Sequence, residues 1–199
     1  MPDLFHSAID LNLPDSHISY YPNFLSATEA DSYFRILREQ TTWQQDDIRV
    51  FGKTYPQPRL TALYANNEKP YSYSNITMHP HVFTNEMEVI KNKVEEITGA
   101  HFTTCLLNLY RTGQDSNGWH ADNEKELGKN PVIASVSLGA ERFFHLKHIS
   151  NLALKQKLLL EHGSLLLMQG ETQHFWKHQI AKTQKQIGER INLTFRIIK

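Results

Sequence analysis

The sequence of 199 residues predicts one domain that is mainly β with flanking helices, an α+β fold. Two observations carry this prediction. Apolar residues at helical intervals occur in two segments of the first hundred residues, whereas the second half consists of short runs of β character separated by turn formers. Short strands that follow helices in this way are typical of a β-sandwich or of a barrel-like roll backed by helices.

The first helix is expected to begin after Ser26. Ser26 and Glu29 have the spacing of a capping box, and apolar residues recur every three or four positions from Ala30 to Leu37. Thr41 interrupts this pattern. The segment therefore predicts a helix with one buried stripe.

A second helix is expected within residues 80–98. Apolar residues from Phe83 to Ile97 repeat the helical spacing, and Gly99 stands where a C-terminal cap belongs. Between the two helices, residues 46–75 are rich in aromatic residues and turn formers and have little periodicity. We interpret them as a long surface excursion with short edge strands, and loops of that length are often functional.

Six strands are expected after the second helix. Each is a short run of β character bounded by Gly, Asn, Pro or Glu. The runs are residues 102–110, 132–138, 142–146, 157–162, 164–169 and 190–198.

The composition excludes several classes of protein. Lys plus Arg and Asp plus Glu number 21 each, so the net charge is zero, and a nucleic-acid partner would need a local basic patch. Cys105 is the single cysteine, which excludes a disulfide framework and indicates a reducing compartment. The first residues have no basic start and no long apolar run, so we expect a cytoplasmic protein, nuclear if eukaryotic, with no membrane association. A monomer is the default expectation.

The stretch GWHADNE contains a candidate pair of metal ligands, His120 and Asp122. Residues i and i+2 of a strand point to the same face, so both side chains can reach one ion. Two histidines and one carboxylate form the facial triad that leaves open positions on Fe(II) for a co-substrate and dioxygen. The third ligand should be a later histidine. The candidates are His145, His148, His162, His174 and His178.

His174 and His178 are four residues apart, which on a helix would suit zinc. The segment lacks the glutamate of the HExxH pattern and follows a turn within a β region, so a zinc protease is disfavoured.

The last expected strand, RINLTFR, has a polar face. Arg190, Asn192, Thr194 and Arg196 alternate with apolar residues. Two buried arginines need an anion, and a small dicarboxylate would satisfy both, because the guanidinium fork matches a carboxylate. The alternative is an outward face of solvated arginines.

Taken together, these motifs resemble the AlkB family of Fe(II)- and 2-oxoglutarate-dependent dealkylating dioxygenases. The match consists of NLY at 108–110, HAD at 120–122, a histidine of HFWKH at 174–178, and RINLTFR at 190–196. Within that family the chain is most similar to the duplex-DNA-repairing branch, the AlkB homologue two type. The resemblance implies a double-stranded β-helix, or jelly roll, as the catalytic core over about residues 101–199. The N-terminal helices and a nucleotide-recognition lid would occupy about residues 1–100 of the same single domain, 1–199.

The resemblance also implies roles for individual residues, which require Fe(II), 2-oxoglutarate as co-substrate, and O2. The implied iron ligands, which are also the catalytic residues, are His120, Asp122 and His178. The implied 2-oxoglutarate pocket consists of Asn108 and Tyr110 on one wall, and Arg190, Asn192, Thr194 and Arg196 on the opposite wall.

The implied substrate-binding residues lie in two segments. They are Phe51, Gly52, Lys53, Tyr71, Ser72, Tyr73 and Ser74 of the lid, and Asn123 and Glu124 after the iron ligands. Phe51 would act as a finger that fills the gap left by a flipped base, and Tyr73 would stack on that base opposite His120. Arg49, Lys53 and Arg59 would contact phosphates. The alternative is that the aromatic residues are the core of a β edge.

The implied activity is oxidative demethylation of N1-methyladenine and N3-methylcytosine in DNA, single-stranded or duplex. It would couple decarboxylation of 2-oxoglutarate to hydroxylation of the methyl group and release of formaldehyde. Two departures from the duplex-repairing pattern are a shorter, moderately basic segment at residues 145–157 and HAD in place of a version with arginine in the middle. The alternatives are an RNA base demethylase and a non-catalytic nucleic-acid-binding member.

Overall fold

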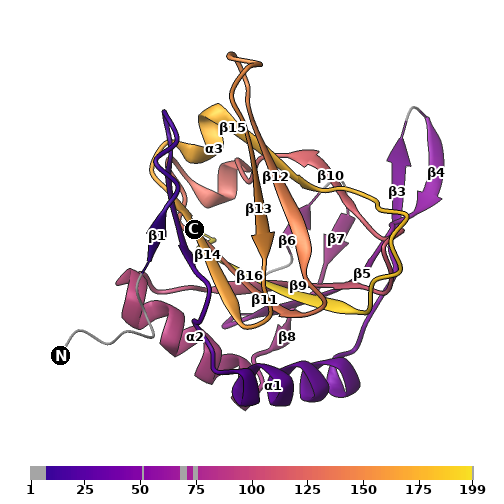
Figure 1. The fold of residues 1–199 in the computed structure, drawn as a ribbon. Coiled ribbons are helices and arrows are strands. Elements are labelled where there is room, and N and C mark those ends of the chain that lie inside the picture. The colour runs from indigo at the N-terminus through magenta and orange to yellow at the C-terminus, as the bar shows by residue number, and fades with distance from the viewer. Residues whose placement is uncertain (1–7, 51, 68–70, 74–75, 199) are drawn as a thin grey trace.

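The computed structural model describes residues 8–50, 52–67, 71–73 and 76–198, and it consists of two large β-sheets with helices on one side (Figure 1). In chain order the elements are β1 (Ile9–Asp10), β2 (His17–Tyr21), α1 (Ala27–Gln40), β3 (Asp47–Val50), β4 (Lys53–Pro56), β5 (Leu60–Ala65), β6 (Tyr71–Tyr73), β7 (Ile76–Met78), β8 (His81–Val82), α2 (Asn85–Thr98), β9 (Thr104–Tyr110), β10 (Asn117–His120), β11 (Ile133–Gly139), β12 (Arg142–His148), β13 (Lys155–Leu160), β14 (Ser164–Gln169), α3 (Thr172–Phe175), β15 (Trp176–Ile180) and β16 (Arg190–Arg196). The prediction of a mainly β, α+β fold is confirmed.

The larger sheet has eight strands in the order β1-β2-β14-β11-β16-β9-β5-β8. All pairs of adjacent strands in this sheet are antiparallel except β5 and β8, which are parallel. β16 lies at its centre, where it pairs with β9 on one side and β11 on the other. All seven residues of β16 are buried, so its polar face is an interior face.

The smaller sheet has four antiparallel strands in the order β10-β15-β12-β13. Its inner face packs on the larger sheet through a cluster of buried residues that includes Tyr110 of β9, Phe144 of β12 and Trp176 of β15. The space between the two sheets is therefore apolar at that cluster and polar along β16.

The helices α1 and α2 lie along the opposite face of the larger sheet (Figure 1). Their buried residues, among them Leu37 and Ile90, pack with Leu107 of β9 and Leu193 of β16. The layers are thus helices, larger sheet, smaller sheet. Among the described residues, no helix has the length and apolar character that a membrane span requires.

Both predicted helices are present with the expected caps. The hydroxyl of Ser26 accepts from the backbone N–H of Glu29 while the Glu29 carboxylate accepts from the backbone of Ser26, which is a capping box. α2 ends at Thr98 and is capped by Gly99, whose φ of 65° is left-handed. It begins at Asn85, five residues after the start of the expected range.

The excursion between the helices differs in part from the expectation. β3 pairs with β4 and β6 with β7 as separate two-stranded sheets, which fits short edge strands. The prediction is wrong for β5, because it is a buried strand between β9 and β8 in the larger sheet. Its sequence, LTALYA, is mostly apolar and buried on both faces, without the alternation of an edge strand. Phe51 and Ser74 lie outside the described residues.

β1 and β2 were not expected from the sequence. β2 pairs with β14 through Ser19 and Leu167, which extends the larger sheet at the edge opposite β8. The half-buried HISYY pattern is too short and too polar to stand out. The two sheets face each other as a jelly roll requires, but the double-stranded β-helix remains a prediction.

Candidate metal centre

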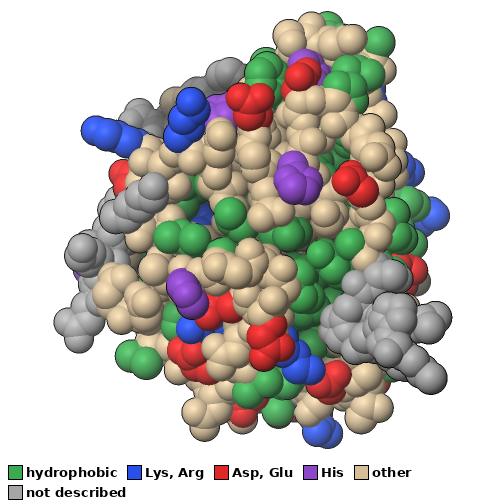
Figure 2. Space-filling view, turned by 90° about the vertical axis from the view of Figure 1, so that its left-hand side faces the viewer, with side chains coloured by type: hydrophobic (Ala, Val, Ile, Leu, Met, Phe, Trp, Pro, Cys, Tyr) green, Lys and Arg blue, Asp and Glu red, His purple; other side chains and the backbone are tan. Residues whose placement is uncertain are grey.

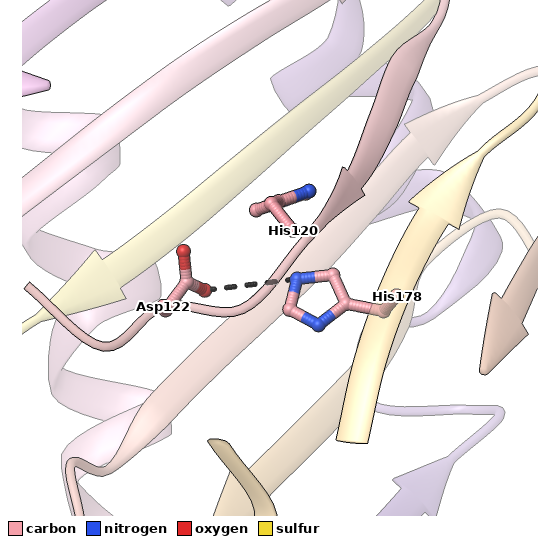
Figure 3. A group of neighbouring side chains, drawn as sticks. All are labelled: His120, Asp122 and His178. Carbon is pink, nitrogen blue, oxygen red and sulfur yellow. Dashed lines mark ion pairs between the residues drawn. The ribbon is translucent and has the colours of Figure 1, made fainter. Parts of the chain in front are cut away.

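Three potential metal ligands converge between the two sheets. His120 ends β10, Asp122 follows two residues later, and His178 lies on β15; Figure 3 shows the three side chains directed into one space. One ligand atom of each lies within 4.8 Å of the others. The pairing of β10 with β15 places His120 opposite His178 and so brings together residues far apart in the chain.

The expectation that one strand carries both His120 and Asp122 is wrong. β10 ends at His120, so Asp122 belongs to the following loop and strand alternation does not orient it. Its backbone N–H donates to the side-chain oxygen of Gln173 at 2.9 Å, and its carboxylate accepts from Arg196 Nη2 at 2.8 Å. Hydrogen bonds from α3 and β16 therefore fix the position of this carboxylate.

His120 is held in the tautomer that a metal needs. Its Nδ1 donates to the carbonyl of Gly118 at 2.7 Å, which leaves the lone pair on Nε2. Asn117 Nδ2 is 3.3 Å from that Nε2. The ring of His178 lies with its centroid 4.2 Å from that of His120 and 5.0 Å from that of Phe144. Nε2 of His120 is thus the nitrogen that can bind an ion.

The electrostatics of the three side chains suit a cation. Burial lowers the pKa of His178 to about 3 and also lowers the pKa of His120, so both imidazoles are neutral at pH 7. Burial alone would raise the pKa of Asp122, but Arg196 and the two histidines lower it below its ordinary value. Two neutral imidazoles and one carboxylate are the protonation states that metal ligands require.

The structure distinguishes among the candidate histidines. His174 lies in α3, is exposed, and makes a hydrogen bond of 2.9 Å with Asn130. His162 accepts from the backbone of Gly139, and His145 lies on β12. Of these histidines only His178 belongs to the described cluster.

The place of His148 near a loop in the sequence predicts an exposed polar position, and this prediction is wrong. It is buried, its Nδ1 accepts from the backbone N–H groups of Ser150 and Asn151, and its Nε2 lies 3.2 Å from Asp15. His148 therefore caps the turn after β12 and does not reach the metal centre.

A pocket beside the three ligands is lined by the polar face of β16 and by β9. All six residues expected to hold 2-oxoglutarate line it together with the three ligands. Asn108 and Tyr110 are not on the opposite wall, because they lie on the adjacent strand, in register with Asn192 and Arg190. One polar sheet face therefore carries all six.

The polar groups on this face bond to one another. Asn192 donates to Ser135 Oγ at 2.7 Å, and Thr194 donates to Asn192 Oδ1 at 2.8 Å. Asn108 accepts from Arg59 Nε at 2.7 Å. Arg59 is only 3% exposed, so its expected contact with phosphate is wrong; its guanidinium supports the pocket wall.

Arg190 is the strongest indication of a bound anion. It is 1% exposed, and Nη2 donates to Ser137 Oγ at 2.9 Å, whereas the buried Nε and Nη1 have no hydrogen-bond partner among the described residues. Burial lowers its pKa to about 10, so it is still charged at pH 7. A carboxylate would satisfy these donors, which fits 2-oxoglutarate. The alternative of an outward, solvated face is wrong, because Arg196 is also buried, at 5% exposed.

The expected substrate residues are only partly described. Glu124 follows the metal ligands, and its buried Oε2 has no hydrogen-bond partner among the described residues; burial raises its pKa. Asn123 beside it is exposed. Gly52 has a φ of 78° in the turn between β3 and β4, and Lys53 is exposed on β4. None of these four lines the pocket.

Three residues of the site were not expected from the sequence. Ser135 and Ser137 lie on β11 and bond to Asn192 and Arg190, and Gln173 bonds to Asp122. The alternation of serine with apolar residues in IASVSL is a signal that β11 has a polar face. No local pattern indicates the role of Gln173, because its partner is 51 residues away.

The family comparison matches nearly the whole chain. Residues 17–196 match the sequence model of the 2OG-Fe(II) oxygenase superfamily. A solved structure described as "The structure of OsALKBH1" superimposes with a TM-score of 0.66 at 16% identity, covering 96% of this chain and all of that chain, which supports the fold alone.

Individual relatives are considerably more similar in sequence. Alpha-ketoglutarate-dependent dioxygenase alkB homolog 3 of Bos taurus is 41% identical over 197 residues, covering 92% of this chain and 66% of that protein. DNA oxidative demethylase ALKBH2 of Arabidopsis thaliana is 36% identical (92% and 67% covered), and ALKBH2 of Mus musculus is 35% identical (89% and 79% covered). The chain thus spans about two thirds of the length of the homolog 3 relatives. Identity to those relatives exceeds identity to ALKBH2, so the expected greater similarity to the homologue two branch is not supported.

Proposed function

Because this chain belongs to the 2OG-Fe(II) oxygenase superfamily, within its AlkB family, we propose that it is an oxidative demethylase of N1-methyladenine and N3-methylcytosine in DNA. The observation that carries the proposal is that two features of the site lie side by side. A two-histidine, one-carboxylate cluster lies beside the buried Arg190, whose Nε and Nη1 lack hydrogen-bond partners among the described residues. The first suits Fe(II), and the second suits a carboxylate of 2-oxoglutarate.

The architecture is consistent with this proposal. We infer that the two facing sheets form the double-stranded β-helix core over about residues 101–199. The N-terminal segment of about residues 1–100 would contribute the helices and the lid of a single domain, 1–199. The described strands of that segment that lie outside the larger sheet are β3 and β4, which form a hairpin, and β6 and β7, and this supports a lid role.

The residues of the pocket would have the following roles. His120, Asp122 and His178 would hold Fe(II), with Arg196 orienting the carboxylate of Asp122. Arg190 and Arg196 would hold the two carboxylates of 2-oxoglutarate, and Asn108, Tyr110, Asn192 and Thr194 would line the pocket around it. Bound iron and 2-oxoglutarate would supply O2-dependent hydroxylation of the N-methyl group, coupled to decarboxylation to succinate, after which formaldehyde leaves.

Recognition of the base would fall to the lid and to the loop after the ligands. The methylated base is cationic, and the carboxylate of Glu124 would favour it over the neutral base. Asn123 would lie near the base edge. Phe51, Gly52, Lys53, Tyr71, Ser72, Tyr73 and Ser74 keep their proposed role in the lid, with Tyr73 stacking on the extruded base.

The substrate panel that tests the proposal has four members. N1-methyladenine is placed in matched single-stranded DNA, duplex DNA, single-stranded RNA and duplex RNA, and loss of the methyl group is followed by mass spectrometry with Fe(II), 2-oxoglutarate and O2. Faster repair of either DNA substrate supports the proposal. Faster turnover of RNA would favour the RNA demethylase, and no turnover on any member, with iron bound, would favour a non-catalytic nucleic-acid-binding protein.

Asp122→Ala is the matched inactive variant for this panel. It removes the carboxylate ligand but leaves the β10 and β15 backbone pairing unchanged. Activity that persists in Asp122→Ala would contradict the assignment of the metal centre.

A further inference from the structure

A further buried arginine, Arg142, lies behind the pocket without lining it. It is the first residue of β12 and is 3% exposed. By contrast, Figure 2 shows Lys and Arg side chains that project from the surface, which is the usual place for a charged side chain. Burial of a guanidinium is unfavourable unless its donors find partners, so the position of Arg142 needs an explanation.

Three backbone carbonyls accept hydrogen bonds from this guanidinium. Nη1 donates to the carbonyl of Thr112 at 3.2 Å, and Nη2 donates to the carbonyls of Asp115 at 3.0 Å and Ala181 at 2.8 Å. Thr112 and Asp115 belong to the loop between β9 and β10, whereas Ala181 directly follows β15. Arg142 therefore joins two segments that are distant in the chain, and these bonds fix the position of its guanidinium.

The same guanidinium lies against the ring of Tyr110. Its Cζ is 5.7 Å from the ring centroid, and Cζ of Arg190 is 5.2 Å from the same centroid. Tyr110 is buried and lines the pocket. Contacts of this length between a cation and an aromatic ring are attractive, and more so when they are buried. Two guanidiniums thus hold the Tyr110 ring, and of these Arg190 lines the pocket whereas Arg142 does not.

The charge of Arg142 also acts on Arg190. Burial is the main cause of the lowered pKa of Arg190; Tyr110 opposes this effect, and the positive charge of Arg142 lowers the pKa further. Asp115 is the acidic side chain whose charge acts on Arg142, and its carboxylate already accepts from Arg111 Nε at 2.8 Å. An anion bound beside Arg190 would therefore be attracted by both buried guanidiniums.

The alternative is that Arg142 only ties the two segments together. Other contacts already do this. The backbone N–H of Thr183 donates to the carbonyl of Gly113 at 2.8 Å, and Gln114 Nε2 donates to the carbonyl of Thr183 at 2.9 Å. The segments are so close that a Cβ at Gly113 would lie 2.8 Å from the Thr183 carbonyl oxygen. The contact of Arg142 with Tyr110 is an addition to these bonds.

We propose that Arg142 is a positioning residue of the 2-oxoglutarate pocket, which acts by holding the Tyr110 ring against Arg190. The inference rests on the proposed function for the assignment of Tyr110 and Arg190 to 2-oxoglutarate. It adds a residue that does not line the pocket but whose substitution weakens binding of the co-substrate. Iron affinity should change little, since Arg142 is not one of the three converging ligands.

Calorimetric titration of 2-oxoglutarate into the anaerobic Fe(II) protein, without nucleic acid, measures the effect. Arg142→Met should weaken 2-oxoglutarate binding about fivefold, because the cation that holds the ring is lost. Arg142→Lys keeps a positive charge beside the ring but loses the planar fork, so its affinity should lie between those of wild type and Arg142→Met. Thermal unfolding of the iron-free variants shows that each is folded before its affinity is compared.

A double-mutant cycle shows whether Arg142 acts through Tyr110. Tyr110→Leu removes the ring and should itself weaken 2-oxoglutarate binding. In the Tyr110→Leu protein, Arg142→Met should weaken binding less than about twofold, because the ring through which it acts is absent. The cycle is repeated with Arg142→Lys, so that it is complete even if Arg142→Met does not fold. An equal loss of affinity with and without the Tyr110 ring would overturn the positioning role.

Gln114→Ala is the matched control. Gln114 is exposed, and its side chain joins the same two segments as Arg142 does. Gln114→Ala should therefore bind 2-oxoglutarate as the wild type does. A fivefold loss in this variant would show that affinity follows the joining of the segments and would overturn the inference.

Arg190→Met separates this inference from the proposed function. Weaker binding in Arg190→Met, with wild-type affinity in Arg142→Met, would overturn the inference and leave the assigned pocket in place. Wild-type affinity in Arg190→Met would refute the pocket and the inference that rests on it. Weaker binding in both, with the loss in Arg142→Met dependent on Tyr110, would support the inference whichever nucleic acid the wild type demethylates.

Discussion

Arg190 is the side chain whose surroundings most require a ligand. We predict that Arg190→Met weakens 2-oxoglutarate binding by about 2 kcal/mol, roughly 30-fold, because charge-assisted hydrogen bonds to the carboxylate are lost. Iron affinity should change little, since Arg190 is not one of the three converging ligands. Calorimetric titration of 2-oxoglutarate into the anaerobic Fe(II) protein measures the effect. Arg38→Met, which breaks an ion pair with Glu189 on the surface, is the control. Equal affinity in Arg190→Met would refute the assigned pocket.

Gln173 acts on the metal centre through Asp122. Gln173→Leu removes the acceptor of the Asp122 backbone N–H, and we predict that iron affinity falls about tenfold, as for other residues that orient metal ligands. Gln173→Glu keeps an acceptor oxygen and should recover part of the loss. Competition with a chelator measures iron affinity, and thermal unfolding of the iron-free variants shows that both are folded. Identical iron affinities in Gln173→Leu and Gln173→Glu would show that Gln173 does not position Asp122.

Sequence patterns identified the metal ligands, but they did not explain why these residues come together in the fold. His120 and Asp122 were recognisable from the motif, and the polar alternation in RINLTFR correctly indicated an interior face. The choice of His178 over His174 depends on a four-residue helix that ends just before β15. The boundary between α3 and β15 decides which histidine points inward. The spacing of the two histidines in the sequence does not reveal where that boundary lies.

An ion pair joins the two helices, between Glu29 of α1 and Lys93 of α2. The hydrogen bond from Lys93, with those from Ser26, lowers the pKa of Glu29 to about 2 from its ordinary value of 4.5. A lowered folded-state pKa stabilises the protein above the unfolded value, and this contribution is lost as pH falls toward the folded value. Glu29→Gln, which keeps the capping geometry, should therefore lower the melting temperature at pH 7.

Measuring the melting temperatures of wild type and Glu29→Gln over a series of pH values provides the control. The difference in melting temperature between wild type and Glu29→Gln should shrink between about pH 4.5 and pH 2, where Glu29 becomes protonated. The effect should be small, because both side chains are partly exposed and solvent screens the pair. A difference that does not depend on pH would show that the ion pair does not contribute.

At the scale of elements, the amphipathic helices and six of the eight strands after α2 match the expected runs, whereas β10 and β15 were not among those runs and strand order was not predictable. Helix caps and periodicity are local, so α1 and α2 follow from a few adjacent residues. β2 is added to the larger sheet by pairing with β14, more than 140 residues later, and β5 is buried by pairing with β9. Those pairings are set by long-range packing, which no local pattern records.

The whole molecule places its metal ligands on segments that are distant in the chain. Iron would link β10, the loop after it and β15, so binding should stabilise the folded state by about 2.7 kcal/mol at a free concentration one hundred times the dissociation constant. We predict that Fe(II) raises the melting temperature of the wild type and that a chelator reverses the rise. Asp122→Ala should show almost no metal-dependent shift. A similar shift in both proteins would place the bound iron elsewhere.

We propose that iron held by His120, Asp122 and His178 couples 2-oxoglutarate turnover to removal of a methyl group from DNA. The most direct measurement quantifies both products in one reaction, with mass spectrometry of a single-stranded oligonucleotide that contains N1-methyladenine and of succinate. We predict one succinate for each methyl group lost, and neither product with Asp122→Ala. Succinate formed at the same rate with no demethylation would contradict the assigned substrate, and demethylation by Asp122→Ala would contradict the assigned metal centre.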